Sequence, residues 1–282
     1  MPIHQISIWD NEPLEEGYRQ LSVLNFREAE HNFREAEQGY VADATGLQEA
    51  IKACRFWQSQ MAGFPVPNDD ILLADHLDSL LCAFQQYTFT SSLKNFRKAV
   101  LHYIVSLFYQ TDDWNEKLLI TAFDLLLEQR DYTKAEVLIQ RGINLYPENH
   151  SLICLQAQVL WLSRQIDQSK HTYIWLFLHH PDAVLMDRIL DHSFRKLVDE
   201  HGIYLTPAYA WLYKVGPYIP VSDDLTVRDE SHRTAIECYQ LIQLSDQAIL
   251  RQDLQESIRY RKRMMELIPE LYQVYYRRLG AR

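Results

Sequence analysis

Histidine and carboxylate side chains fall at helical spacing in two short stretches of this sequence. The two groups are Asp75, His76 and Ser79, and Asp187, Asp191 and His192. Either group could ligate a metal ion if a second helix supplied the remaining ligands. Surface polar residues account for both groups better, so the sequence predicts no metal site and no cofactor.

The sequence lacks the common catalytic and nucleotide-binding motifs. It has no phosphate-binding loop, no glycine-rich dinucleotide motif, no zinc-protease motif and no nucleophile elbow. His179 and His180 precede Pro181 at a predicted helix end, where a cation complements the helix dipole. No nucleophile can be paired with a base. We therefore expect a protein that is not an enzyme; an enzyme on a helical scaffold is an open alternative.

The four cysteines lie far apart, and none forms a C-x-x-C pair. Apolar residues flank most of them, which predicts buried, reduced thiols at Cys54, Cys82, Cys154 and Cys238. The first residues lack a basic segment followed by an apolar core, and no apolar run reaches about 18 residues. These features predict a cytoplasmic protein that is not in a membrane.

Composition and charge restrict the fold and the partners. The 282 residues include only 8 Gly and 10 Pro, which argues against a turn-rich all-β chain. The net charge of −10 argues against a general affinity for nucleic acid or anionic membranes. Residues 251–282 nevertheless hold 8 bases and 4 acids, a net +4. A solvated helix face explains this cluster, and an anionic partner is the alternative.

Apolar residues recur at helical spacing along nearly the whole chain. The predicted helices span 15–38 (as two short helices), 43–62, 70–87, 91–110, 116–129, 133–145, 150–163, 167–179, 183–199, 206–214, 230–250, 254–267 and 270–279. We expect a loop over 216–227 and an extended stub over 5–9. No other strand is predicted, so the fold class is all-α.

An internal repeat is the clearest pattern in the sequence. Pro147 and Pro181 are 34 residues apart, and so are Tyr132 and Ile166. Two further pairs keep the same register: the small residues Ala135 and Ser169, and the bulky residues Ile139 and Tyr173. A unit of about 34 residues that holds two helices is typical of a helical repeat protein.

These residues resemble the tetratricopeptide repeat (TPR) family. Gln129–Ala135 is similar to the family's turn into its second helix, and Tyr146–Asn149 to its exit. The clearest repeats cover 116–181, weaker units cover 15–40 and 240–270, and 41–115 and 182–239 are divergent or contain insertions. In the last unit Arg261 replaces the usual bulky residue, so we expect that helix to face solvent as a cap.

The resemblance implies one domain over residues 1–282: a right-handed α-solenoid of antiparallel helical hairpins, with about a dozen helices. It also implies a protein-binding scaffold or adaptor with a concave groove for a peptide or a partner helix. The candidate groove residues are Tyr18, Gln20, Ile120, Asp124, Gln158 and Asp246. This mixed, slightly acidic set favours a basic or amphipathic ligand.

The family's clamp for a chaperone's C-terminal carboxylate is not expected here, because its lysine and asparagine positions hold neither residue. Those positions are Leu14, Tyr18, Ile120, Asp124, Cys154 and Gln158.

Two other surfaces are open alternatives to the groove. The aromatic residues of segment 204–218 either pack in the core or form an exposed anchor; they are Tyr204, Tyr209, Trp211, Tyr213 and Tyr218. The basic C-terminal helices could instead belong to a regulatory module that recognises a peptide or nucleic acid, or could dock a second copy of the chain.

Overall fold

The computed structural model describes residues 12–38, 44–62, 70–108, 116–222 and 225–280. These residues form helices and no strand, which confirms the predicted all-α class. The α-helices are α1 (Glu12–Ser22), α2 (Phe26–Gln38), α3 (Ala44–Ala62), α4 (Asp70–Gln86), α5 (Lys94–Phe108), α6 (Glu116–Glu128), α7 (Tyr132–Leu145), α8 (Ser151–Leu162), α9 (Ile166–His179), α10 (His192–His201), α11 (Thr206–Leu212), α12 (Glu230–Leu250), α13 (Leu254–Leu267) and α14 (Pro269–Gly280). The predicted stub at 5–9 lies outside the described residues.

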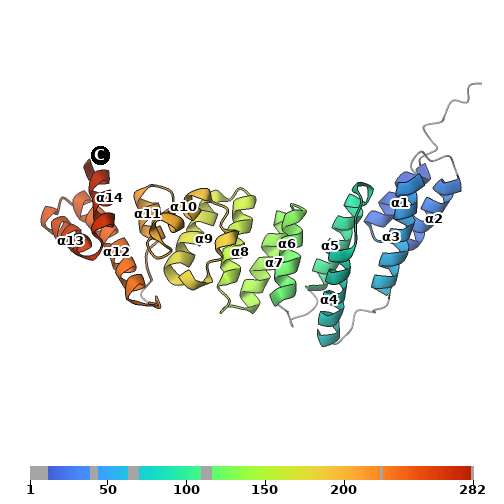
Figure 1. The fold of residues 1–282 in the computed structure, drawn as a ribbon, viewed down its shortest axis with the longest axis horizontal. Helices are drawn as coiled ribbons and strands as arrows, with labels where there is room; N and C mark the ends of the chain where they lie inside the picture. Colours follow the sequence, from blue (N-terminus) through green and yellow to red (C-terminus); the bar gives the residue numbers. More distant parts are fainter. Residues whose placement is uncertain (1–11, 39–43, 63–69, 109–115, 223–224, 281–282) are drawn as a thin grey trace, which may run out of the picture. The chain divides into compact units, whose positions relative to one another are not determined.

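The chain divides into two compact units, residues 1–131 and 132–282. In the first unit α2 packs against α1 and α3, α5 packs against α1 and α4, and α6 packs against α4 and α5 (Figure 1). The core of this unit includes a group of aromatic rings around the fully buried Trp57. The rings of Phe84, Phe89 and Phe96 lie 6.4, 5.9 and 6.3 Å from its ring.

In the second unit, neighbouring helices of the sequence mostly pack against each other (Figure 1). Helix α8 lies between α7 and α9, α11 contacts α9, α10, α12 and α14, and α13 contacts α12 and α14. Tyr173, Phe177, Phe194 and Tyr239 are among the fully buried aromatic side chains of its core. Because α13 packs against α12 and α14, one of its faces is covered and the other is exposed. The candidate site lies on the exposed face.

Four turns between successive helices share one backbone geometry. Each has a residue in the left-handed region: Leu24 (φ 61°), Arg130 (φ 57°), Arg164 (φ 66°) and Gln252 (φ 63°). The following N–H bonds to the carbonyl five residues back in each turn; an example is Gln165 N to Leu160 O at 2.9 Å. Arg130 and Arg164 are separated by the same period as Pro147 and Pro181, so the sequence repeat recurs in the backbone.

A small, fully buried residue follows each of these turns by five positions. These residues are Ala29, Ala135, Ser169 and Ser257. Small side chains allow close approach of the paired helices within each unit. Ser169 Oγ donates to the carbonyl of Ala157 at 2.7 Å, and the hydroxyls of Ser245 and Ser257 lie 3.1 Å apart.

The single helix predicted over 183–199 is wrong. The structure has short 3₁₀ turns at Pro181–Ala183 and Met186–Arg188, and α10 begins only at His192. Asp191 caps α10 by accepting a hydrogen bond from Ser193 N at 2.8 Å. The carbonyl of Ile189 accepts a hydrogen bond from Arg195 Nη2 at 2.7 Å. A side chain thus supplies a hydrogen bond to a backbone carbonyl in this non-helical segment. The predicted loop is non-helical over its described residues, 216–222 and 225–227.

Candidate partner-binding surface

Helix α13 has a well-defined start that fixes which of its faces is buried. Gln252 takes the left-handed conformation, and Asp253 caps the helix by accepting from Glu256 N at 3.0 Å. On the inner face, Ser257 and Met264 are fully buried. α12 and α14 pack against α13, so this face is occupied within the unit.

Hydrogen bonds between α12 and α14 hold the neighbouring part of the unit in place. Tyr275 OH lies 2.9 Å from Ser245 Oγ and donates to Asp246 Oδ1 at 2.9 Å. Arg278 lies 3.5 Å from Asp246 and its guanidinium lies 5.1 Å from the ring centre of Trp211. Burial raises the pKa of Tyr275 to about 12, so its hydroxyl stays protonated and keeps donating in alkaline solution near pH 10 as well as at neutral pH.

The outer face of α13 exposes three large apolar side chains. Leu254 is 64% exposed, Ile258 57% and Met265 44%. Their spacing of four and seven residues places them on one side of the helix, and we call this set the α13 stripe. Leu250, which ends α12, is 80% exposed. Single exposed apolar residues are normal, but a row of them on one helix marks a candidate interaction site.

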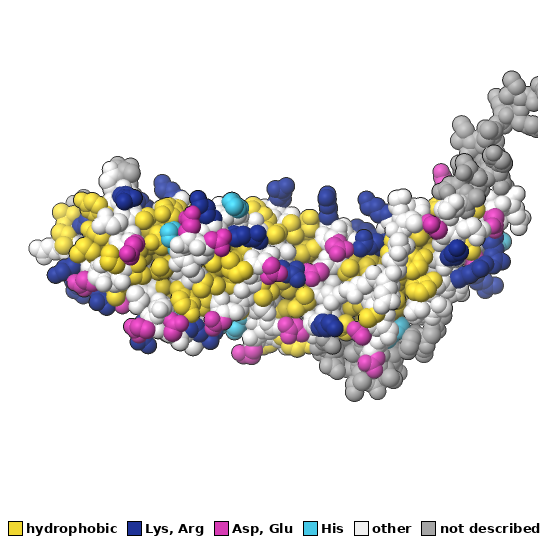
Figure 2. All heavy atoms as spheres, in the orientation of Figure 1, with side chains coloured by type: hydrophobic (Ala, Val, Ile, Leu, Met, Phe, Trp, Pro, Cys, Tyr) yellow, Lys and Arg dark blue, Asp and Glu magenta, His cyan; other side chains and the backbone are white. Residues whose placement is uncertain are grey.

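Positive charge lies beside the α13 stripe. With about 100° between successive residues, the exposed Lys262 projects on one side of it, between Ile258 and Met265, and the half-buried Arg261 lies on the other. Helix α13 holds four bases and two acids, so its charge is 4 − 2 = +2. Figure 2 shows Lys and Arg side chains beside hydrophobic ones at the end of unit 2 that contains α13.

Only some of these charges are neutralised within the described part of the chain. Arg263 donates to Glu237 at 2.7 Å and lies 3.7 Å from Glu266, and the hydrogen bond to Glu237 raises its pKa. Arg259 and Lys262 have no ion-pair partner among the described residues. Both line a shallow cleft of about 450 Å³ between α12 and α13. The surface therefore combines exposed apolar area with uncompensated positive charge.

The structure divides the six predicted groove residues between the two units. Tyr18, Gln20, Ile120 and Asp124 lie in the first unit, and Gln158 and Asp246 in the second. The four in the first unit are half-buried, and the ring of Tyr18 packs edge-on against Phe33 at 5.1 Å.

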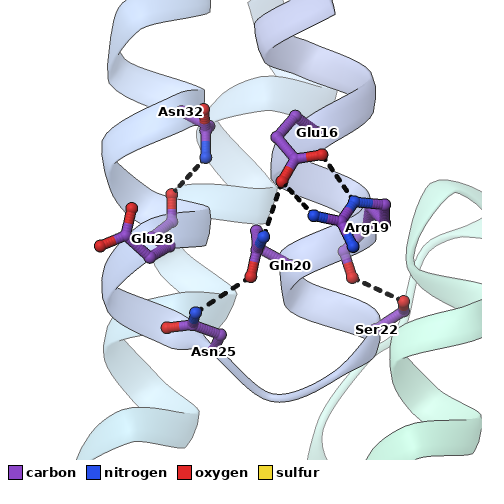
Figure 3. A network of polar contacts seen from close by, with 7 residues as sticks. All are labelled: Glu16, Arg19, Gln20, Ser22, Asn25, Glu28 and Asn32. Atoms are coloured by element: carbon purple, nitrogen blue, oxygen red, sulfur yellow. Dashed lines mark hydrogen bonds and ion pairs between the residues drawn. The ribbon is translucent and has the colours of Figure 1, made fainter.

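Gln20, Gln158 and Asp246 have side-chain polar groups that are engaged or buried. The amide of Gln20 donates to Glu16 at 2.6 Å and accepts from Asn25 at 3.0 Å (Figure 3). Gln158 is only 8% exposed, and Asp246 accepts from Tyr275. These three therefore offer little to a partner.

The aromatic segment 204–218 is mostly core. Tyr209 is buried, with its ring stacked 3.5 Å from that of His201, and Tyr218 stacks on Tyr239 at 4.8 Å. Tyr213 is the large apolar residue of this segment that is well exposed. The hypothesis of core packing therefore accounts for most of these rings.

The α13 stripe was not predicted from the sequence. The spacing of Leu254, Ile258 and Met265 was the available signal, but Tyr260, Met264 and Leu267 mark a second apolar face at the same helical period. Only the contacts with α12 and α14 show which face is covered. Arg261 led us to expect that its helix faces solvent as a cap; the side chain of Arg261 itself is half-buried, with its Nε donating to the carbonyl of Ser257 at 3.2 Å.

The described residues contain no group of three or more His, Cys, Asp or Glu side chains arranged to hold a metal ion. All four cysteines are free. Cys54, Cys154 and Cys238 are buried as predicted, and burial raises their pKa values to about 12, 11 and 12. Cys82 is exposed on α4, so the prediction of burial is wrong there.

No described helix combines the length and the apolar character needed to cross a membrane. In comparisons with known proteins, no family model, no curated protein and no solved structure matches the chain.

Proposed function

We propose that this chain is a non-catalytic protein–protein interaction scaffold that binds a segment of another protein. The proposed architecture is a right-handed, TPR-like α-solenoid. The recurrence of one turn geometry at Leu24, Arg130, Arg164 and Gln252 supports it, as do the small buried residues that follow each turn. A scaffold of stacked hairpins presents whole helix faces to a partner, which is a common way of binding peptides and helices.

The single observation that carries this proposal is the α13 stripe. A helix packed on one face by α12 and α14 exposes a second apolar face made of Leu254, Ile258 and Met265. Burying such side chains against a partner is favourable by about 25 cal/mol per Å². The α13 stripe is better supported than the groove, because Gln158 is buried and Asp246 is bonded to Tyr275.

Affinity capture with the full-length chain tests the proposal. The bait is compared with Ile258→Asp and with the matched variant Val137→Asp. Val137 is a β-branched residue of α7 that is 52% exposed, so both changes place a carboxylate on an exposed helix position. We expect wild type and Val137→Asp to retain the same protein partner and Ile258→Asp to lose it. Equal capture by all three baits, at equal thermal stability, contradicts the proposal.

Binding of nucleic acid through the basic C-terminal helices is the second candidate function. Arg259 and Lys262, which have no ion-pair partner in the described ranges, favour it, but phosphate contacts leave the apolar side chains of the stripe unexplained. Nuclease treatment of the captured material distinguishes the two candidates. Under our proposal the protein partner is retained, whereas under the second candidate it is released.

We also propose a cytoplasmic location. Four free cysteines fit a reducing compartment, because disulfides form mainly in oxidising ones. In an oxidising compartment the thiol of the exposed Cys82 would be open to oxidation. Fractionation of cells that express the tagged chain tests this assignment.

A further inference from the structure

We infer that the partner segment bound by the α13 stripe is an acidic amphipathic helix. This inference rests on the proposed function and adds the chemistry of the partner to it. It follows from the length of the stripe, from the charges beside it and from the way nearby acids are already engaged.

The length of the stripe matches a short helix. Leu254 and Met265 are eleven residues apart, which is about 16 Å along a helix axis. A partner helix of about three turns covers this distance. Its apolar residues must recur every three to four residues to follow Leu254, Ile258 and Met265 along one face.

The charges beside the stripe select an acidic partner. The exposed Lys262 projects beside the stripe, so it would face one flank of a helix lying along it, whereas Arg261 on the other side is half-buried and its Nε bonds the carbonyl of Ser257. Lys262 forms no ion pair with the two carboxylates that line its cleft: Glu237 accepts from Arg263 at 2.7 Å, and Glu266 lies 3.7 Å from Arg263. Glutamate or aspartate on the partner's flank would pair with Lys262 and steer association.

A second copy of the chain fits this surface less well. The α1–α2 hairpin is acidic, with seven acids and three bases over residues 12–38. Over those residues, however, Val23 is the only large hydrophobic side chain that is well exposed. One apolar residue cannot cover the three positions of the stripe, so a separate helix with its own apolar face is the better match.

Selection from a displayed peptide library tests the inference with the full-length chain. The library presents helices of about five turns in which apolar positions vary among Leu, Ile, Met and Phe, and flanking positions vary among Glu, Lys and Gln. Wild type should enrich helices with Glu at the flanks, with at least about tenfold preference over the same helices carrying Lys. The Lys262→Glu variant should shift the enrichment towards Lys at the flank. The matched change Lys52→Glu, at an exposed position of α3 with no ion pair among the described residues, should not.

Each further outcome has a separate meaning. Enrichment without regard to charge, lost in Ile258→Asp, overturns the acidic partner and leaves the proposed function standing. Enrichment that Ile258→Asp does not alter, or none at all, overturns the inference, and the affinity capture then decides the proposed function alone. A dimer of the chain in light scattering that Ile258→Asp abolishes also overturns the inference, because the occupant is then a second copy.

Discussion

Gly17 shows how closely the first two helices approach. A Cβ atom placed there would lie 2.5 Å from Phe33 Cε1 and 2.6 Å from Cδ1. Phe33 is fully buried, so its ring cannot turn aside without disturbing the core of the first unit.

Gly17→Ala should therefore destabilise the first unit by about 1–3 kcal/mol, through overpacking of this contact. The midpoint of urea unfolding measures the change. Gly280→Ala is the matched control, because a Cβ at the end of α14 meets no atom within 4 Å. Equal midpoints for wild type and Gly17→Ala would show that α1 and α2 do not pack this closely.

His180 makes stability depend on pH. Its ring stacks on that of His150 at 3.3 Å. Burial, followed by the charges of His150, Arg228 and His179, lowers its pKa to about 4. The unfolded chain has an ordinary histidine pKa of about 6.5 and so binds the proton first as the pH falls. The contribution of His180 to stability is complete above about pH 6.5 and is lost progressively down to about pH 4.

Replacing His180 with Phe should keep the stacked ring and remove this part of the pH dependence. The difference between melting temperatures at pH 7.5 and pH 5 should be smaller in His180→Phe than in wild type. His171→Phe, at an exposed position of α9, should leave the difference unchanged. An unchanged difference in His180→Phe would exclude His180 as the source.

At the scale of the elements, the shared turns place non-glycine residues in a strained conformation. Arg164 has φ 66°, and its side chain is exposed. Contacts of this side chain therefore offset little of the energetic cost of the left-handed backbone. Arg164→Gly should stabilise the second unit by about 0.5–1 kcal/mol. Gly202→Ala, at φ 79°, should change stability in the opposite direction. Calorimetric melting of both variants measures these effects, and equal signs would contradict the turn geometry.

The sequence predicts elements well where periodicity and caps agree. The predicted helices at 230–250 and 254–267 coincide with α12 and α13, because Asp229 and Asp253 cap their starts. The prediction for 183–199 is wrong because the side chain of Arg195 bonds the carbonyl of Ile189, a feature that local periodicity does not contain. The α13 stripe could not be predicted for a related reason. Helix α13 has two apolar faces with the same helical spacing, and only its packing against α12 and α14 shows which face is buried and which is exposed.

At the scale of the whole molecule, the proposed solenoid predicts a large radius of gyration. A compact protein of 282 residues has a radius of about 19 Å. A solenoid of the same length must exceed this value clearly, because each hairpin contacts only its neighbours. Small-angle X-ray scattering of the full-length chain measures the radius. A radius no larger than that of the compact protein would exclude the solenoid, although the α13 stripe would still be exposed within its own unit.

We propose that the outer face of α13 holds a segment of another protein. Site-specific photo-crosslinking from position 258 tests it most directly, with position 137 as the control at a similarly exposed helix position. We expect one crosslinked protein from position 258, joined through an acidic, amphipathic helical segment, and no such product from position 137. No protein crosslink from position 258, or the same products from both positions, would contradict it.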